Sequence, residues 1–202
     1  MAEASLAGHL GAHEHETTTG LNHRKVLMWI FLGSECLFFG SLISTYLVYR
    51  DRSLVGPFPS DTFDIPYTSV SSFVLLMSSL TMVLALAAGQ RRNSGQMRLW
   101  LTTTALLGTV FLGGQVYEFT SFVNHGLSLS KNLFGTTFFV LTGFHGAHVT
   151  VGVIILLSLV LNSLRGGIKE GETLGIEIAG LYWHFVDVVW IVIFTVVYLL
   201  PY

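Results

Sequence analysis

The sequence predicts an all-α membrane protein, built as a bundle of five transmembrane helices. Of the 202 residues, 51% are hydrophobic and only 11% are charged, whereas soluble domains carry about 25% charged residues. The mean hydropathy is +0.64. Five apolar runs without Lys or Arg are each long enough to cross roughly 30 Å of hydrocarbon at about 1.5 Å per helical residue. These runs are residues 26–49, 69–90, 99–123, 133–161 and 177–200.

The ends of the runs are marked by polar residues and proline. The first run follows a polar tail at residues 1–25, which we separate from a five-helix domain at residues 26–202. Arg91 ends the second run, Arg98 precedes the third, and Pro201 terminates the fifth. The fourth run lies between two polar connections, so the five runs read as separate helices.

The positive charges predict the orientation of the bundle. Cytoplasmic loops of membrane proteins carry an excess of Lys and Arg. Seven of these residues fall on the side of the N-terminus, namely Arg24, Lys25, Arg91, Arg92, Arg98, Arg165 and Lys169. The other side carries three, namely Arg50, Arg52 and Lys131. We therefore expect the N-terminus in the cytoplasm and, because the number of spans is odd, the C-terminus outside.

Six titratable side chains inside the runs are the candidate site residues. A charged group at the bilayer centre costs about 2.5–3.5 kcal/mol on insertion scales, so such residues face protein or water and are usually functional. The stretch YWHFVDVVW places His184 and Asp187 three residues apart, on one face of the last helix. The full set is Glu35, Glu118, His145, His148, His184 and Asp187.

The acids of the first and third runs each have a structural and a functional interpretation. Glu35 lies near the middle of its run, beside the small residues Gly33 and Gly40 that allow close helix packing. It is either a carboxyl hydrogen-bonded to a neighbouring helix or one that exchanges protons or faces lipid. For Glu118, in FLGGQVYEF, the residues favour a structural role.

The histidines of the fourth run leave three chemistries open. His145 and His148, in GFHGAH, share one helix face. They could ligate haem, relay protons, or pair with acids on other helices. We favour acid–histidine pairing across helices, because each pair lowers the cost of burying both groups.

Other features of the sequence bear on function class. The single cysteine, Cys36, lies inside a run and can form no internal disulfide. The chain contains no cysteine pair of the dinuclear copper type, no glycine-rich phosphate loop, no HExxH and no nucleophile elbow. The residues therefore point to no redox or hydrolytic centre in this chain, and we predict no catalytic, cofactor-binding or metal-ligating residue.

Four motifs together resemble subunit III of the haem–copper terminal oxidases. They are WIFLGSECLFFG, FLGGQVYEF, GTTFFVLTGFHGAHVTVG and YWHFVDVVWIVIFTVVYL. The resemblance covers residues 26–202 and implies the bacterial five-helix form, which lacks the first two helices of longer members. Glu35 then matches the membrane carboxyl that carbodiimides modify in the family. The other five candidates match family positions that line a cleft for phospholipid.

The resemblance also implies the partners and role of the chain. It implies a non-catalytic core subunit that packs against subunit I, with haems and copper held by subunits I and II and none in this chain. The expected role is to stabilise subunit I during turnover, bind phospholipid and support proton uptake in a proton-pumping oxidase of the bacterial cytoplasmic membrane. Membership of a larger respiratory supercomplex is compatible with this role, and no nucleic acid is expected.

Two kinds of oxidase share this subunit. We favour cytochrome c oxidase over a ubiquinol or menaquinol oxidase, because Glu35 resembles the usual cytochrome c oxidase pattern. Two other hypotheses stay open. A membrane cytochrome b would use His145 or His148 with His184, and a small proton-coupled transporter would use Glu35 with Asp187.

Overall fold

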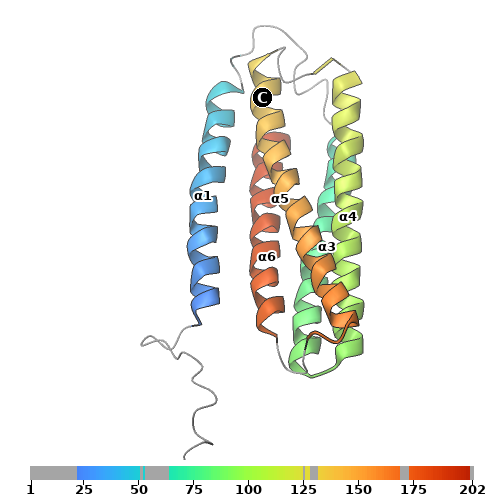
Figure 1. The fold of residues 1–202 in the computed structure, drawn as a ribbon. Coiled ribbons are helices and arrows are strands. Elements are labelled where there is room, and N and C mark those ends of the chain that lie inside the picture. The colour runs from blue at the N-terminus through green and yellow to red at the C-terminus, as the bar shows by residue number, and fades with distance from the viewer. Residues whose placement is uncertain are drawn as a thin grey trace, which may run out of the picture.

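A computed structural model describes residues 22–50, 52, 64–124, 126–127, 132–168 and 173–200. These residues form five long helices and confirm the predicted all-α class (Figure 1). The helices are α1 His23–Tyr49, α3 Ile65–Gln90, α4 Ser94–Asn124, α5 Leu133–Leu164 and α6 Leu174–Phe194, which continues as the π-helical turn η2 Thr195–Leu199. All five are long and apolar enough to cross a membrane. Most of the predicted tail, Lys131, Lys169 and Pro201 lie outside the described residues.

Several helices begin earlier than the apolar runs because polar residues cap their first turns. Asn22 accepts a hydrogen bond from the Arg24 backbone N–H at 2.9 Å, and α1 begins at His23 rather than at residue 26. Asp64 caps α3 in the same way, with the Tyr67 N–H 3.2 Å from its Oδ1. Side-chain oxygens at this position satisfy N–H groups that the helix leaves free. Hydropathy alone does not detect such turns.

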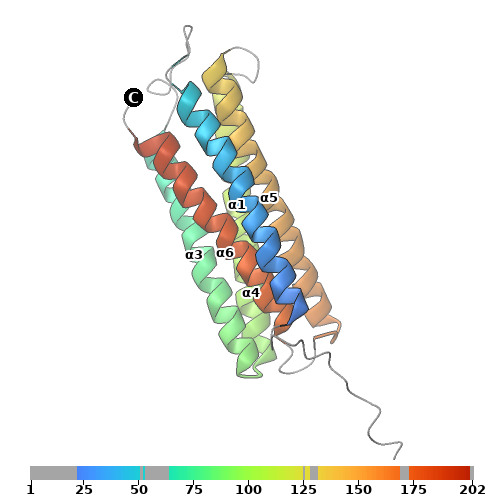
Figure 2. The same ribbon diagram turned by 90° about the vertical axis from the view of Figure 1, so that its left-hand side faces the viewer.

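Helices that follow one another in the sequence are antiparallel, and α6 contacts α1, α3 and α5. In sequence order, α3 packs on α4, α4 on α5 and α5 on α6, and α6 also packs on α3 and α1. Figure 2 shows α1 in front of the bundle, beside α6 and α5, and Figure 1 shows it at one side of the bundle. The buried side chains of α1 are Leu32, Phe39 and Tyr46, which are seven residues apart. One narrow stripe of α1 therefore faces the bundle.

Trp183 of α6 is the centre of the packed core. Its side chain is 1% exposed and lies between two glycines of other helices, Gly108 on α4 and Gly152 on α5. A Cβ atom at Gly108 would lie 2.5 Å from the Trp183 ring, and one at Gly152 would lie 2.8 Å from it. The absence of side chains at these two positions is what admits the indole between α4 and α5.

Candidate functional site

The six candidate residues lie on four helices and fall into separate polar contacts rather than one site. Glu35 lies on α1, Glu118 on α4, His145 and His148 on α5, and His184 and Asp187 on α6. His145, Glu118 and Asp187 are buried, with 0%, 6% and 5% of their surface exposed. One of these contacts joins α1 to α5.

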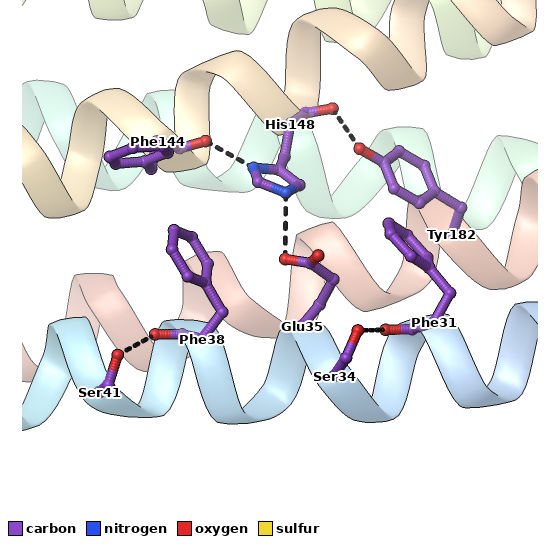
Figure 3. A network of polar contacts seen from close by, with 8 residues as sticks. All are labelled: Phe31, Ser34, Glu35, Phe38, Ser41, Phe144, His148 and Tyr182. Atoms are coloured by element: carbon purple, nitrogen blue, oxygen red, sulfur yellow. Dashed lines mark hydrogen bonds and ion pairs between the residues drawn. The ribbon is translucent and has the colours of Figure 1, made fainter.

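Glu35 and His148 face each other across α1 and α5 (Figure 3). The Glu35 Oε2 atom is 3.3 Å from His148 Nε2. The other ring nitrogen, Nδ1, lies 2.8 Å from the Phe144 carbonyl oxygen, and the Tyr182 hydroxyl donates to the His148 carbonyl at 3.0 Å. The cross-helix acid–histidine pairing expected from the sequence is confirmed for these two residues.

The Phe144 carbonyl decides how a proton is shared in this pair. A carbonyl oxygen only accepts, so His148 Nδ1 carries a hydrogen and donates it. In a neutral imidazole, Nε2 is then an acceptor, and an ionised carboxylate is also an acceptor. The contact with Glu35 therefore requires one proton between Oε2 and Nε2, bound to the carboxyl or to the imidazole.

Aromatic rings enclose this pair. The Phe39 ring lies edge-on to His148 at a centroid distance of 5.0 Å, and Phe38 lies at 6.3 Å. Phe38 in turn packs edge-on against Phe144 at 5.2 Å. The side chains of Glu35 and His148 keep 17% and 19% of their surface exposed. The pair thus lies in a largely apolar setting that still has access from outside the chain.

His184 binds a serine rather than an acid of another helix. Its Nδ1 atom is 2.9 Å from the Ser79 Oγ on α3. Asp187 follows one turn later on α6, and its Oδ1 atom is buried without a hydrogen-bond partner among the described residues. The expected cross-helix pairing of an acid with His184 is therefore not what the structure shows, because a hydroxyl of α3 occupies that position.

Glu118 and His145 have different surroundings again. The Thr68 hydroxyl donates to Glu118 Oε1 at 2.6 Å, and the Tyr198 hydroxyl donates to the same oxygen at 3.3 Å. His145 stacks on the Trp190 indole, with ring centroids 4.8 Å apart. Neither ring nitrogen of His145 has a hydrogen-bond partner in the described part of the chain. Both residues are thus buried within the bundle, and the structural role that the sequence favours for Glu118 stays a prediction.

The hydroxyl groups of α3 are the polar partners that the sequence analysis missed. Ser78 accepts a hydrogen bond from the Trp183 indole at 3.0 Å, and Ser72 accepts one from the Trp190 indole at 2.9 Å. With Thr68 and Ser79, these serines form the polar side of a helix that hydropathy treats as uniformly apolar. Their recurrence at helical spacing was the available signal.

A cavity of about 340 Å³ lies next to His184, between α1, α3 and α6. Lys25 and Glu177 form an ion pair among its lining residues. Apolar side chains make up most of the rest, namely Trp29, Met82, Val83, Leu86 and Leu181. An apolar cavity with one charged end suits an amphiphilic molecule.

The arrangement of the histidines also bears on haem ligation. A haem between two helices needs a histidine of each helix directed at the same space. His148 of α5 is directed at Glu35 on α1, whereas His184 of α6 is directed at Ser79 on α3. Across the described ranges, no three His, Cys, Asp or Glu side chains form a group able to hold a metal ion.

Nearly the whole chain is similar to one family of known proteins. The sequence profile described as cytochrome c oxidase subunit III matches residues 2–202. The chain is 38% identical to cytochrome c oxidase subunit 3 of Bacillus sp. (strain PS3) over 189 residues, which cover 94% of this chain and 91% of the relative.

Quinol oxidase subunits are similar to the same degree. Identity to quinol oxidase subunit 3 of Bacillus subtilis (strain 168) is 38%, covering 93% of this chain and 91% of the relative. Identity to cytochrome bo(3) ubiquinol oxidase subunit 3 of Pseudomonas aeruginosa is 36%, covering 99% and 94%. The family match at residues 2–202 includes all five apolar helices, and the chain belongs to the cytochrome c oxidase subunit III family.

Proposed function

We propose that this chain is the non-catalytic core subunit III of a bacterial aerobic respiratory oxidase of the haem–copper type, favouring cytochrome c oxidase, which reduces oxygen to water and pumps protons. The observation that carries the proposal is the family match over residues 2–202, together with relatives covered over nine-tenths of their length. Subunits I and II are the partners in this proposal, and they hold the haems and copper.

The exposed surface of α1 supports assembly with partner subunits. Only Leu32, Phe39 and Tyr46 of this helix are buried. Large apolar side chains such as Leu27 and Leu37 are 69% and 78% exposed. Exposed apolar area of this extent has to be covered by lipid or by another membrane subunit.

Binding of phospholipid is the second part of the proposed role. The cavity of about 340 Å³ offers an apolar wall for an acyl chain. Its Lys25–Glu177 ion pair lies where α1 and α6 begin, where a polar headgroup would be expected. A lipid held there would fix α1 against α3 and α6, and so support the stability of subunit I and proton uptake by it during turnover.

We propose the cytoplasmic membrane as the location of the chain, with its N-terminus inside. In Figure 1 the start of α1, the turn between α3 and α4 and the end of α5 lie at the same end of the bundle. This end carries Arg24, Lys25, Arg91, Arg92, Arg98 and Arg165. The excess of positive charge supports a cytoplasmic position for it.

A quinol oxidase is the alternative function, because quinol oxidase subunits are as similar to this chain as a cytochrome c oxidase subunit is. The test is to purify the tagged chain from its own membrane in mild detergent and identify what accompanies it by mass spectrometry. A large haem-binding subunit with a partner that carries a dinuclear copper motif supports cytochrome c oxidase. A partner without that motif supports the quinol oxidase. The chain alone, with stoichiometric haem, contradicts both.

A further inference from the structure

We propose that a pocket at the junction of α3 and α4 binds an organic ammonium group. The pocket has a volume of about 430 Å³ and is formed where α3 begins and α4 ends. It lies at the opposite end of the bundle from the cavity beside His184. Its lining residues are Asp64, Tyr67, Tyr117, Glu118, Ser121 and Phe122.

Aromatic rings form one wall of this pocket. The rings of Tyr67 and Tyr117 lie 5.6 Å apart at 51°, and the buried Phe122 adds a third ring to the lining. The Tyr67 hydroxyl donates to the Gly114 carbonyl at 3.3 Å. A Cβ atom at Gly114 would lie 3.1 Å from that hydroxyl, so the glycine allows the close approach. The wall is therefore fixed by α4 rather than free to collapse.

Two carboxyl groups line the same pocket. Asp64 caps α3 through its Oδ1 atom and is exposed to solvent. Glu118 lies deeper, and its Oε1 atom is held by the hydroxyls of Thr68 and Tyr198. The described lining contains no Lys, Arg or His to balance these acids.

Carboxyls beside aromatic faces select a particular kind of cation. The negative face of an aromatic ring attracts alkylammonium groups within about 6 Å, and aromatic cages bind quaternary ammonium in this way. Small metal ions instead need several oxygen ligands around one point. The start of α3 and the end of α4 lie at the edge of the membrane-spanning segments. The ammonium group could therefore arrive free in solution or as the head of a zwitterionic lipid.

The first experiment measures binding of choline to the purified oxidase complex by flow dialysis at low ionic strength, with the full chain present. The neutral molecule of the same shape, 3,3-dimethylbutan-1-ol, is the competitor. We expect saturable choline binding that the neutral molecule does not displace. Displacement by equal concentrations of the neutral molecule, or no saturable binding, would overturn the proposal.

Two variants locate the site in this chain. Asp64→Asn removes the charge but keeps a side chain that caps helices equally well, and it should weaken choline binding at least about fivefold. Tyr117→Leu removes an aromatic wall that is 66% exposed, and it should weaken binding about threefold. Tyr49→Leu, at the end of α1, is the control and should bind as the wild type does. Equal affinities in all variants would place the binding elsewhere and contradict the proposal.

The source of the ammonium group is decided in nanodiscs. Complexes are reconstituted in phosphatidylglycerol with or without phosphatidylethanolamine, and the retained lipid is measured by mass spectrometry after washing. If the group belongs to a lipid, the wild type retains phosphatidylethanolamine and Asp64→Asn does not. If both retain it equally while choline binding still depends on Asp64, the ligand is a free ammonium ion.

Discussion

The Glu35–His148 contact shows how one backbone carbonyl sets the chemistry of a half-buried pair. Because Phe144 fixes the hydrogen on Nδ1, the nitrogen that faces Glu35 needs a donor whenever the imidazole is neutral. The carboxyl can provide one only when it holds the shared proton. Which side chains position 35 tolerates therefore depends on their ability to donate, more than on their charge.

Glu35→Gln should preserve this contact and Glu35→Ala should not. The amide of glutamine donates to the neutral Nε2 of His148, whereas alanine leaves that nitrogen without a partner. Hydrogen bonds between membrane helices contribute about 0.6 kcal/mol on average and up to about 1.7 kcal/mol. We expect a lower midpoint of thermal unfolding and faster loss of oxidase activity during turnover for Glu35→Ala, with Glu35→Gln close to wild type. Identical behaviour of the two variants would show that the contact does not hold α1.

At the scale of elements, the packing of α4, α5 and α6 depends on the space around Trp183. Gly108→Ala or Gly152→Ala would place a methyl group 2.5 Å or 2.8 Å from its ring. The indole is almost fully buried and its N–H is bound to Ser78, so it cannot move aside. We expect each change to reduce the free energy of unfolding by about 1–3 kcal/mol, measured by unfolding of the purified protein in mixed detergent micelles.

The matched controls are Gly113→Ala on α4 and Gly143→Ala on α5. A Cβ atom at either position meets no atom within 4 Å. Alanine also has a higher helix propensity than glycine, by about 1 kcal/mol. Both controls should therefore unfold at or above the wild-type midpoint. A loss of stability in the controls equal to that at Gly108 would mean that the clash with Trp183 is not the cause.

The contact between α3 and α6 uses two indoles at a spacing of seven residues. Trp183 and Trp190 donate to Ser78 and Ser72, and all four residues are buried. Ser72→Ala and Ser78→Ala should each lower stability by about 0.6–1.7 kcal/mol, because a buried indole N–H would lose its acceptor. Ser158→Ala is the control. The Ser158 hydroxyl is exposed and donates only within its own helix, to the Ile155 carbonyl. Equal unfolding midpoints for all three variants would refute a role for these hydrogen bonds.

These elements also show what the sequence can and cannot predict. The five helices were predictable because hydropathy and length are properties of a run, which needs no knowledge of its neighbours. Polar partners depend on how each helix is rotated in the bundle. His148 contacts an acid of another helix, Glu35, as predicted. His184 instead contacts Ser79, and His145 stacks on the Trp190 ring. Nothing in the spacing of α5 or α6 distinguishes these outcomes, since all three histidines lie on polar, small-residue faces.

At the scale of the molecule, burial is uneven in a way that fits a subunit of a larger complex. Trp183 and Trp190 anchor α6 between three other helices, whereas α1 buries only one narrow stripe. Two acid–base contacts, Lys25–Glu177 and Glu35–His148, then join α1 to α6 and α5. The stability of α1 therefore depends on polar contacts and on its surroundings more than that of α6 does.

The orientation of the molecule gives the last prediction. The end of the bundle that holds the start of α1 also holds the turn between α3 and α4, with Arg91 and Arg92. Seven of the ten Lys and Arg residues of the chain belong to this end by sequence, and such an excess favours retention in the cytoplasm. Fusion of green fluorescent protein to the C-terminus should give dark cells, whereas alkaline phosphatase fused there should be active. Insertion of the same reporters at the α3–α4 turn should give the opposite pattern. A fluorescent C-terminal fusion would reverse the assigned topology and move the ammonium pocket to the cytoplasmic side.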